Sequence, residues 1–207
     1  MHGRGIVRIL AALGLAVASI GASAQQAPGA GPYLGVAAGI ARHDFGGTDR
    51  ALALFGGYRF ARFFAVEGRY ADLGSGTSTQ VIDTCPAIEC LIPSLETIHE
   101  RRSADRVSIG LSGVVPIGAR FEAFARVGYG RVQYGHQVAI TGDLVRGSGV
   151  ARNAGSQHAS AAEFAAGVRF NATAAWAVRL EGERIADAGG EQPITTGWIG
   201  MEYRFGG

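Results

Sequence analysis

The chain has 207 residues, including 33 glycines and two cysteines, and all 19 of its basic residues are arginine, against 17 acidic residues. This length suits one domain, and a formal charge of +2 lacks the basic excess that nucleic-acid binding requires, so no nucleic-acid partner is expected. No segment after the N-terminal region approaches the ~20 apolar residues of a transmembrane helix.

Residues 1–24 have the features of a secretory signal peptide. Arg4 and Arg8 precede an apolar stretch, Ile9 to Ala18, and Ala22-Ser23-Ala24 fits a small-residue cleavage site. A transmembrane helix is the alternative, but the apolar stretch is short for one. We therefore predict that the chain is exported, with residues 25–32 as a periplasmic lead-in.

Eight segments then alternate between two sets of residues with a period of two, the periodicity of β-strands. The segments are 33–42, 51–60, 64–72, 105–117, 120–134, 159–170, 175–184 and 194–205. In each, one set is apolar and uncharged, whereas the other carries glycine, alanine, arginine and glutamate. An apolar outside and a charged inside are typical of a barrel in lipid. The sequence therefore predicts an all-β fold, an eight-stranded antiparallel transmembrane β-barrel over residues 33–205.

The connections between these segments alternate in length. Short turns fall near 61–63, 118–119 and 171–174, and longer polar or glycine-rich segments near 43–50, 73–104, 135–158 and 185–193. In outer-membrane barrels the short turns are periplasmic. We therefore expect short periplasmic turns and long extracellular loops, of which 73–104 is the longest.

Thirteen charged residues belong to the inward set. They are Arg59, Glu67, Arg69, Arg106, Glu122, Arg126, Glu163, Arg169, Arg179, Glu181, Glu183, Glu202 and Arg204. An eight-stranded barrel is just wide enough for side chains to fill its interior, and enclosed charges must pair. This pattern predicts a salt-bridge network that fills the barrel. The alternative is a narrow, porin-like channel for small solutes lined by the same charges.

Three segments carry a resemblance to a known family. They are the opening Pro32-Tyr33-Leu34-Gly35-Val36-Ala37-Ala38-Gly39, the hairpin from Gly57-Tyr58-Arg59-Phe60 to Ala65–Gly74, and the close Met201-Glu202-Tyr203-Arg204-Phe205. The chain resembles the small outer-membrane β-barrels of the OmpA/OmpX and opacity-protein type. The resemblance implies a bacterial outer-membrane location, a C-terminal strand that engages the barrel-assembly machinery, and loops that contact host or surface ligands.

Cys85 and Cys90 lie in the longest predicted loop. An exported chain favours a disulfide between them, which would shape the tip of the loop. A metal site that includes His99 of the same loop is a weak alternative, because two cysteines and a distant histidine make an incomplete ligand set. We expect no metal and no cofactor.

Four arginines share the outward parity at the long-loop end: Arg42, Arg50, Arg131 and Arg184. Such arginines commonly extend along the surface to keep their charge in water. The outer leaflet at this level is expected to be lipopolysaccharide, and the guanidinium fork matches the geometry of its phosphates. We therefore consider a belt of contacts between these arginines and lipopolysaccharide phosphate.

His158 and Ser160 suggest one enzymatic alternative. Lipid A deacylases of the outer membrane carry a His-x-Ser pair on a lipid-facing strand, and these two residues share the outward parity of Phe164. A nucleophile also needs a third group that orients its base, and Glu163 has the wrong parity for that role. The sequence therefore favours a non-enzymatic barrel whose loops serve adhesion or envelope integrity, with the channel and the deacylase as alternatives.

Overall fold

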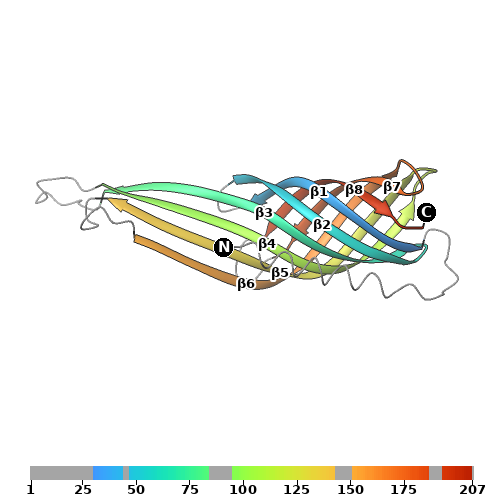
Figure 1. Cartoon of the computed structure of the whole chain (residues 1–207), viewed down its shortest axis with the longest axis horizontal. Helices are drawn as coiled ribbons and strands as arrows, with labels where there is room; N and C mark the ends of the chain where they lie inside the picture. The colour runs from blue at the N-terminus through green and yellow to red at the C-terminus, as the bar shows by residue number, and fades with distance from the viewer. Residues whose placement is uncertain (1–29, 44–46, 84–94, 143–150, 187–192, 207) are drawn as a thin grey trace, which may run out of the picture.

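The computed structural model describes residues 30–43, 47–83, 95–142, 151–186 and 193–206, which form eight antiparallel strands in a closed barrel (Figure 1). The strands are β1 Gly31–His43, β2 Gly47–Ala61, β3 Phe64–Asp83, β4 Leu95–Pro116, β5 Phe121–Gly142, β6 Ala151–Asn171, β7 Trp176–Ile185 and β8 Ile194–Arg204. Pairing of β1 with β8, from Tyr33 opposite Arg204 to Arg42 opposite Thr195, closes the ring. The predicted eight-stranded antiparallel barrel is confirmed.

The inner and outer faces of the barrel wall differ in exposure, as the alternation of residues along each strand predicts. In β8, for example, the Trp198 side chain is buried in the lumen while its neighbour Ile199 is 57% exposed. Leucine, valine, isoleucine and phenylalanine side chains are exposed in the same way all round the barrel. Soluble proteins rarely expose a continuous apolar surface of this kind, whereas a bilayer would cover it.

Aromatic residues gather at the short-turn end of the outer surface. The rings of Phe60 and Phe64 lie 6.4 Å apart across the β2–β3 turn. Trp176 and Tyr203 meet edge to face at 4.9 Å, and so do Tyr203 and Phe205. Such a girdle is typical of the membrane–water interface.

Within the described residues, no helix is long and apolar enough to cross a membrane.

The four central strands are much longer than the alternation predicted. β3 and β2 stop pairing at Asp72, yet β3 and β4 remain paired as far as Asp83 opposite Leu95. β6 likewise continues to Ala151, although β7 pairs with it only as far as Glu163. Much of the segments 73–104 and 135–158, expected as loops, is therefore strand. The strands β3–β6 run on together beyond the barrel, as Figure 1 shows, and we call this part the projection.

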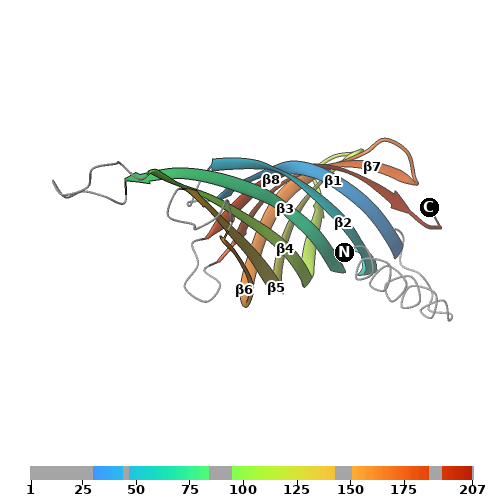
Figure 2. The same ribbon diagram turned by 60° about the vertical axis from the view of Figure 1, so that its left-hand side comes forward.

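A β-bulge marks the start of the projection on β3. Two residues of β3, Leu73 and Gly74, lie opposite the single Ala104 of β4. Gly74 has φ +90°, which favours glycine, and its N–H donates to the Asp72 carboxylate at 2.9 Å. A bulge bends its strand and increases the local twist. It lies where β3 stops pairing with β2. Both views show β3 separating from β2 and continuing into the projection (Figures 1 and 2).

Candidate functional site

The lumen of the barrel contains all thirteen charged residues of the inward set. Eleven of them are buried, and Glu122 and Arg204 at the short-turn end are partly exposed. They form two clusters that are joined by aromatic side chains. We call them the central cluster and the end cluster.

The central cluster contains four arginines and four glutamates. Its members are Glu67, Arg69, Arg106, Arg126, Glu163, Arg179, Glu181 and Glu183. Their side chains are at most 2% exposed, and their formal charges cancel. Removing charges from water is costly unless each is paired, so this balance is what permits their burial.

Glu67, on β3, accepts hydrogen bonds from four side chains, one on its own strand and three on other strands. Arg179 Nη1 donates to it at 2.6 Å and Arg126 Nη1 at 3.0 Å. The Tyr33 hydroxyl donates at 3.0 Å, and Arg69 Nη2 at 3.4 Å. Because β1, β3, β5 and β7 all contribute, this one carboxylate ties opposite walls of the barrel together.

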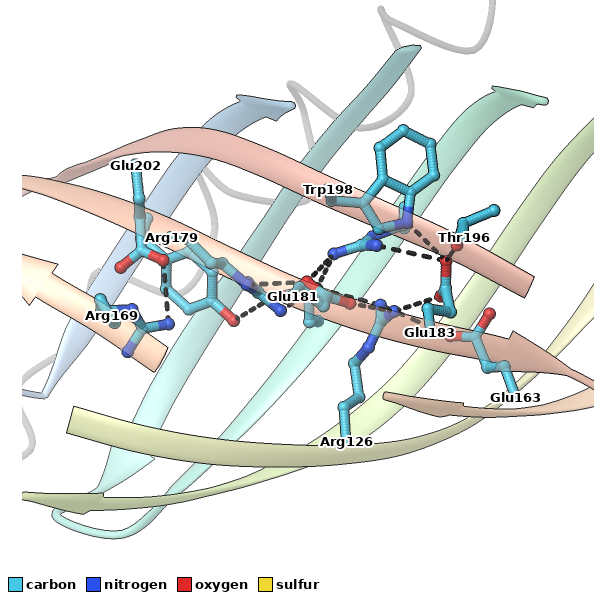
Figure 3. Close-up of polar contacts among 12 residues, drawn as sticks. Arg126, Glu163, Arg169, Arg179, Glu181, Glu183, Thr196, Trp198 and Glu202 are labelled. Atoms are coloured by element: carbon cyan, nitrogen blue, oxygen red, sulfur yellow. Dashed lines mark hydrogen bonds and ion pairs between the residues drawn. The ribbon is translucent and has the colours of Figure 1, made fainter. Parts of the chain in front are cut away.

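Glu183 is the second point at which several donors meet. Arg126 Nη2 donates to it at 2.6 Å, and the Trp198 indole N–H and the Thr196 hydroxyl donate at 2.9 and 3.0 Å. Figure 3 shows Glu183 between Arg126 on one side and Thr196 and Trp198 on the other. Arg106 also pairs with Glu183 at 2.9 Å. The carboxylate is therefore surrounded by donors from β4, β5 and β8.

The end cluster lies toward the short turns. Arg59 binds Glu122 through two parallel hydrogen bonds of 3.0 Å each, the bidentate geometry that makes arginine–carboxylate pairs strong. Arg169 and Arg204 also contact Glu122, at 3.1 and 3.2 Å. Both of them reach Glu202 as well, at 2.9 and 3.1 Å. Two glutamates thus hold three arginines.

Aromatic rings fill the space between the two clusters. The Arg179 guanidinium lies 4.2 Å from the centre of the Phe124 ring, and Arg169, in the end cluster, lies 5.6 Å from the same ring. Arg179 also lies 4.9 Å from Phe55, and Arg169 5.9 Å from Tyr33. These cation–π contacts stabilise the charges and occupy the lumen between the charge pairs.

The rim arginines lie outside the barrel. Arg42, Arg50, Arg131 and Arg184 are all exposed on the outer face. Arg42 and Arg184 are both register partners of Thr195, whereas Arg131 lies apart, opposite Val107 and Ser160. The expected belt is therefore uneven, because three of its four arginines lie on β7, β1 and β2 and the fourth lies on β5.

The other candidate residues are not brought together into a site. His158 and Ser160 are exposed on the outer face of β6, and their register partners are Gln133 and Arg131. In the described part of the chain, no third group completes this pair as a triad. His99 instead shares a hydrogen bond with Thr79 at 3.1 Å.

Cys85 and Cys90 lie outside the described residues, so their predicted disulfide stays a prediction. The predicted signal peptide lies outside them as well. Among the residues that are described, no three histidine, cysteine, aspartate or glutamate side chains gather as a metal site.

Comparison with known proteins agrees with this architecture. The sequence model of the outer membrane protein β-barrel domain matches residues 10–205, nearly the whole chain. No curated protein matches.

Solved barrels resemble the chain at low identity. The attachment invasion locus protein Ail of Yersinia pestis, solved with the heparin analogue sucrose octasulfate, is 16% identical with a TM-score of 0.46 over 85% of this chain and 97% of Ail. OprG of Pseudomonas aeruginosa is 12% identical with a TM-score of 0.49, covering 85% of this chain and 96% of OprG. The N-terminal barrel domain of OprF from the same organism is 11% identical with a TM-score of 0.44, covering 85% and 99%.

Proposed function

Because this chain belongs to the outer membrane protein β-barrel family, we propose that it is a closed, non-enzymatic barrel that presents the projection outside the cell for adhesion. The barrel would serve as the membrane anchor and the projection as the working surface. Envelope integrity is the broader role that the same anchor would support.

The observation that carries this proposal is the pair of unpaired strand edges on the projection. β3 from Ser75 to Asp83 pairs only with β4, and β6 from Ala151 to Ala161 pairs only with β5, among the residues described. An exposed edge presents free backbone N–H and C=O groups, to which an extended segment of another protein can add as a further strand.

The side chains of the projection suit an aqueous location. On β3, Thr77, Thr79 and Gln80 are exposed, and Arg101 and Arg102 are exposed on β4. Arg102 Nε donates to Glu100 at 2.6 Å. These polar side chains suit contact with water on both faces of the sheet. The unpaired backbone N–H and C=O groups then lie along its two edges.

The filled lumen supports the non-conducting part of the proposal. The central cluster spans the cross-section with side chains at most 2% exposed. A water-filled path would expose them. We expect planar-bilayer recordings of the refolded protein to show no stepwise conductance, and stable open-channel steps would favour the channel instead.

Adhesion can be tested by removing the projection, with all four strands cut at residues that lie opposite one another. Ser75, Ser103, Gly135 and Ser156 lie opposite one another across β3–β6. A two-residue Asn-Gly turn joining Ser75 to Ser103, and another joining Gly135 to Ser156, would leave a barrel with short loops. Because an edge strand pairs with an extended segment of another protein, cells displaying the whole chain should adhere to protein-coated wells, and cells displaying the shortened chain should not.

The controls separate loss of adhesion from loss of folding. The shortened barrel should still migrate differently in electrophoresis before and after boiling, as a closed barrel does. Variants with only one hairpin shortened should show which edge is used. Equal adhesion by the whole and the shortened chains would exclude the projection as the adhesive surface.

A further inference from the structure

The outer face of the barrel has a shallow groove across β6, β7, β8 and β1. Its floor is a row of small residues in register, Ala166, Gly182 and Gly197, and Ile40 of β1 closes the row. On the short-turn side the groove is bounded by larger apolar residues, among them Leu180 and Ile199, which are 51% and 57% exposed. The groove therefore lies within the surface that the bilayer covers.

The glycines of the groove are not required by the packing of the barrel. A Cβ added to Gly182 would have no atom within 4 Å, and one added to Gly197 would meet only the Ile40 side chain at 3.9 Å. Gly200, which faces the lumen, is different, because its Cβ would lie 2.8 Å from the Val36 carbonyl oxygen. Glycine within a strand weakens it and often marks a site of close approach by another molecule.

An arginine pair stands directly above the groove on the long-loop side. Arg42 follows Ile40 by two residues, Arg184 follows Gly182 by two, and both are register partners of Thr195. Since neighbouring strands are about 4.8 Å apart, their Cα atoms are separated by roughly 10 Å, close enough for both guanidinium groups to reach one anion. Both are exposed, and neither forms an ion pair with another described residue.

The interior arginines differ from this pair in their carboxylate contacts. All seven of them contact at least one carboxylate. Arg42 and Arg184, by contrast, lie beside an apolar groove with no described carboxylate as partner. Within the described residues, therefore, no carboxylate neutralises the two guanidinium groups.

We propose that this groove and arginine pair bind one molecule of lipid A, the phosphorylated and acylated glycolipid of the outer leaflet. A phosphate would sit between Arg42 and Arg184, whose guanidinium groups match phosphate oxygens in pairs. An acyl chain would lie along Gly197 and Gly182, where missing side chains allow close van der Waals contact. A second copy of the chain is a less favourable occupant, because a symmetric dimer through this groove would bring the positively charged arginine pairs of both copies together.

Native mass spectrometry of the refolded protein in detergent micelles tests this proposal. The probes are bis-phosphorylated lipid A, its enzymatically dephosphorylated form, and phosphatidylglycerol. Lipid A should bind with one-to-one stoichiometry, and dephosphorylated lipid A at least tenfold more weakly. The double variant Arg42→Gln, Arg184→Gln should lose binding at least tenfold, and so should Gly182→Leu with Gly197→Leu, which fills the groove without touching the phosphates.

Two matched controls lie elsewhere on the outer face. Arg131→Gln removes an exposed arginine outside the pair, and Gly113→Leu enlarges a glycine whose Cβ also meets nothing within 4 Å. Both should bind lipid A as the parent does. Boiling-sensitive migration of every variant confirms folding.

Some outcomes would overturn the proposal. They are absence of lipid A binding to the parent, equal binding of the dephosphorylated form, unchanged binding by either double variant, or equal loss in the controls. Phosphatidylglycerol bound as tightly as lipid A would show that the groove accepts any anionic lipid, and dimers without bound lipid would assign it to a second copy.

Discussion

At the scale of single residues, the barrel interior depends on carboxylates that each serve several cations. Glu67 accepts from Tyr33, Arg69, Arg126 and Arg179, so its removal would leave three buried guanidinium groups short of a partner. Breaking a buried charge pair from one side typically costs about 3–5 kcal/mol. We expect Glu67→Ala to lower the free energy of unfolding by about this amount in urea titrations of vesicle-inserted protein followed by tryptophan fluorescence.

The control for Glu67 is a glutamate in an exposed ion pair. Glu100 pairs with Arg102 on the projection, where the two side chains are 30% and 46% exposed. Solvent screens such a pair, so Glu100→Ala should change the free energy of unfolding by less than about 1 kcal/mol. If Glu67→Ala were equally mild and opened a stable conductance, the interior would be a water-filled path rather than a packed network.

Two glycines on neighbouring strands give a second residue-scale prediction. A Cβ on Gly167 would collide with the Leu180 carbonyl oxygen and lie 2.7 Å from the Phe124 ring, whereas one on Gly182 would meet nothing within 4 Å. Gly167→Ala should therefore destabilise the barrel. Gly182→Ala should be neutral, or stabilising by about 0.5–1 kcal/mol, because alanine loses less backbone freedom on folding. The same urea titration measures both, and equal destabilisation would contradict the assigned faces.

At the scale of the strands, the sequence predicted the lipid-spanning parts and missed the projection. Inside the bilayer each outward residue must be apolar, so the period of two is unmistakable, as in Leu52 and Leu54 of β2. Beyond the bilayer both faces of the sheet meet water, so the outward residues no longer need to be apolar. The run from Thr77 to Val81 is polar and β-branched, which suits a strand without displaying any alternation.

Hydrogen exchange should distinguish the inner and edge strands of the projection. β4 from Thr97 to Ser103 pairs with β3 on one side and β5 on the other, so all its backbone amides are bonded. β6 from Asn153 to Ser160 pairs with β5 alone, so alternate amides face outward. We expect slow exchange throughout the first segment and fast exchange at alternate residues of the second. Rapid exchange in both would mean that the projection does not persist in solution.

At the scale of the whole molecule, parity predicted which charges face inward but could not predict their partners. Arg59 on β2 meets Glu122 on β5, and Arg69 on β3 meets Glu181 on β7. Such pairs cross the lumen, and which strands face each other at one level depends on the tilt and stagger of the closed sheet. The alternation of residues within one strand does not reveal the tilt or the stagger of the barrel. Phe55 and Phe124 share the inward parity of Arg59 and Glu122, so the period marks them as lumen residues, but it does not show that their rings lie between the two clusters.

Orientation in the membrane can be tested by cysteine labelling. In a Cys85→Ala, Cys90→Ala background, Thr79→Cys places a thiol on the exposed face of the projection, and Thr173→Cys places one in the β6–β7 turn. A membrane-impermeant maleimide applied to intact cells should label the first and spare the second. Permeabilised cells should label both. The reverse pattern on intact cells would invert the barrel.

The continuity of β3–β6 from the barrel into the projection has a mechanical consequence. A pull on the tips of the projection acts along β3–β6, and the load passes into the barrel at two seams. These are the β2–β3 ladder from Leu52 to Ala61 and the β6–β7 ladder from Glu163 to Asn171. Along both seams the force runs parallel to the strands, so the ladder resists in shear, with its hydrogen bonds loaded together instead of being peeled one at a time. Under the proposed adhesive function, this arrangement would hold a cell against flowing liquid while the barrel stays intact.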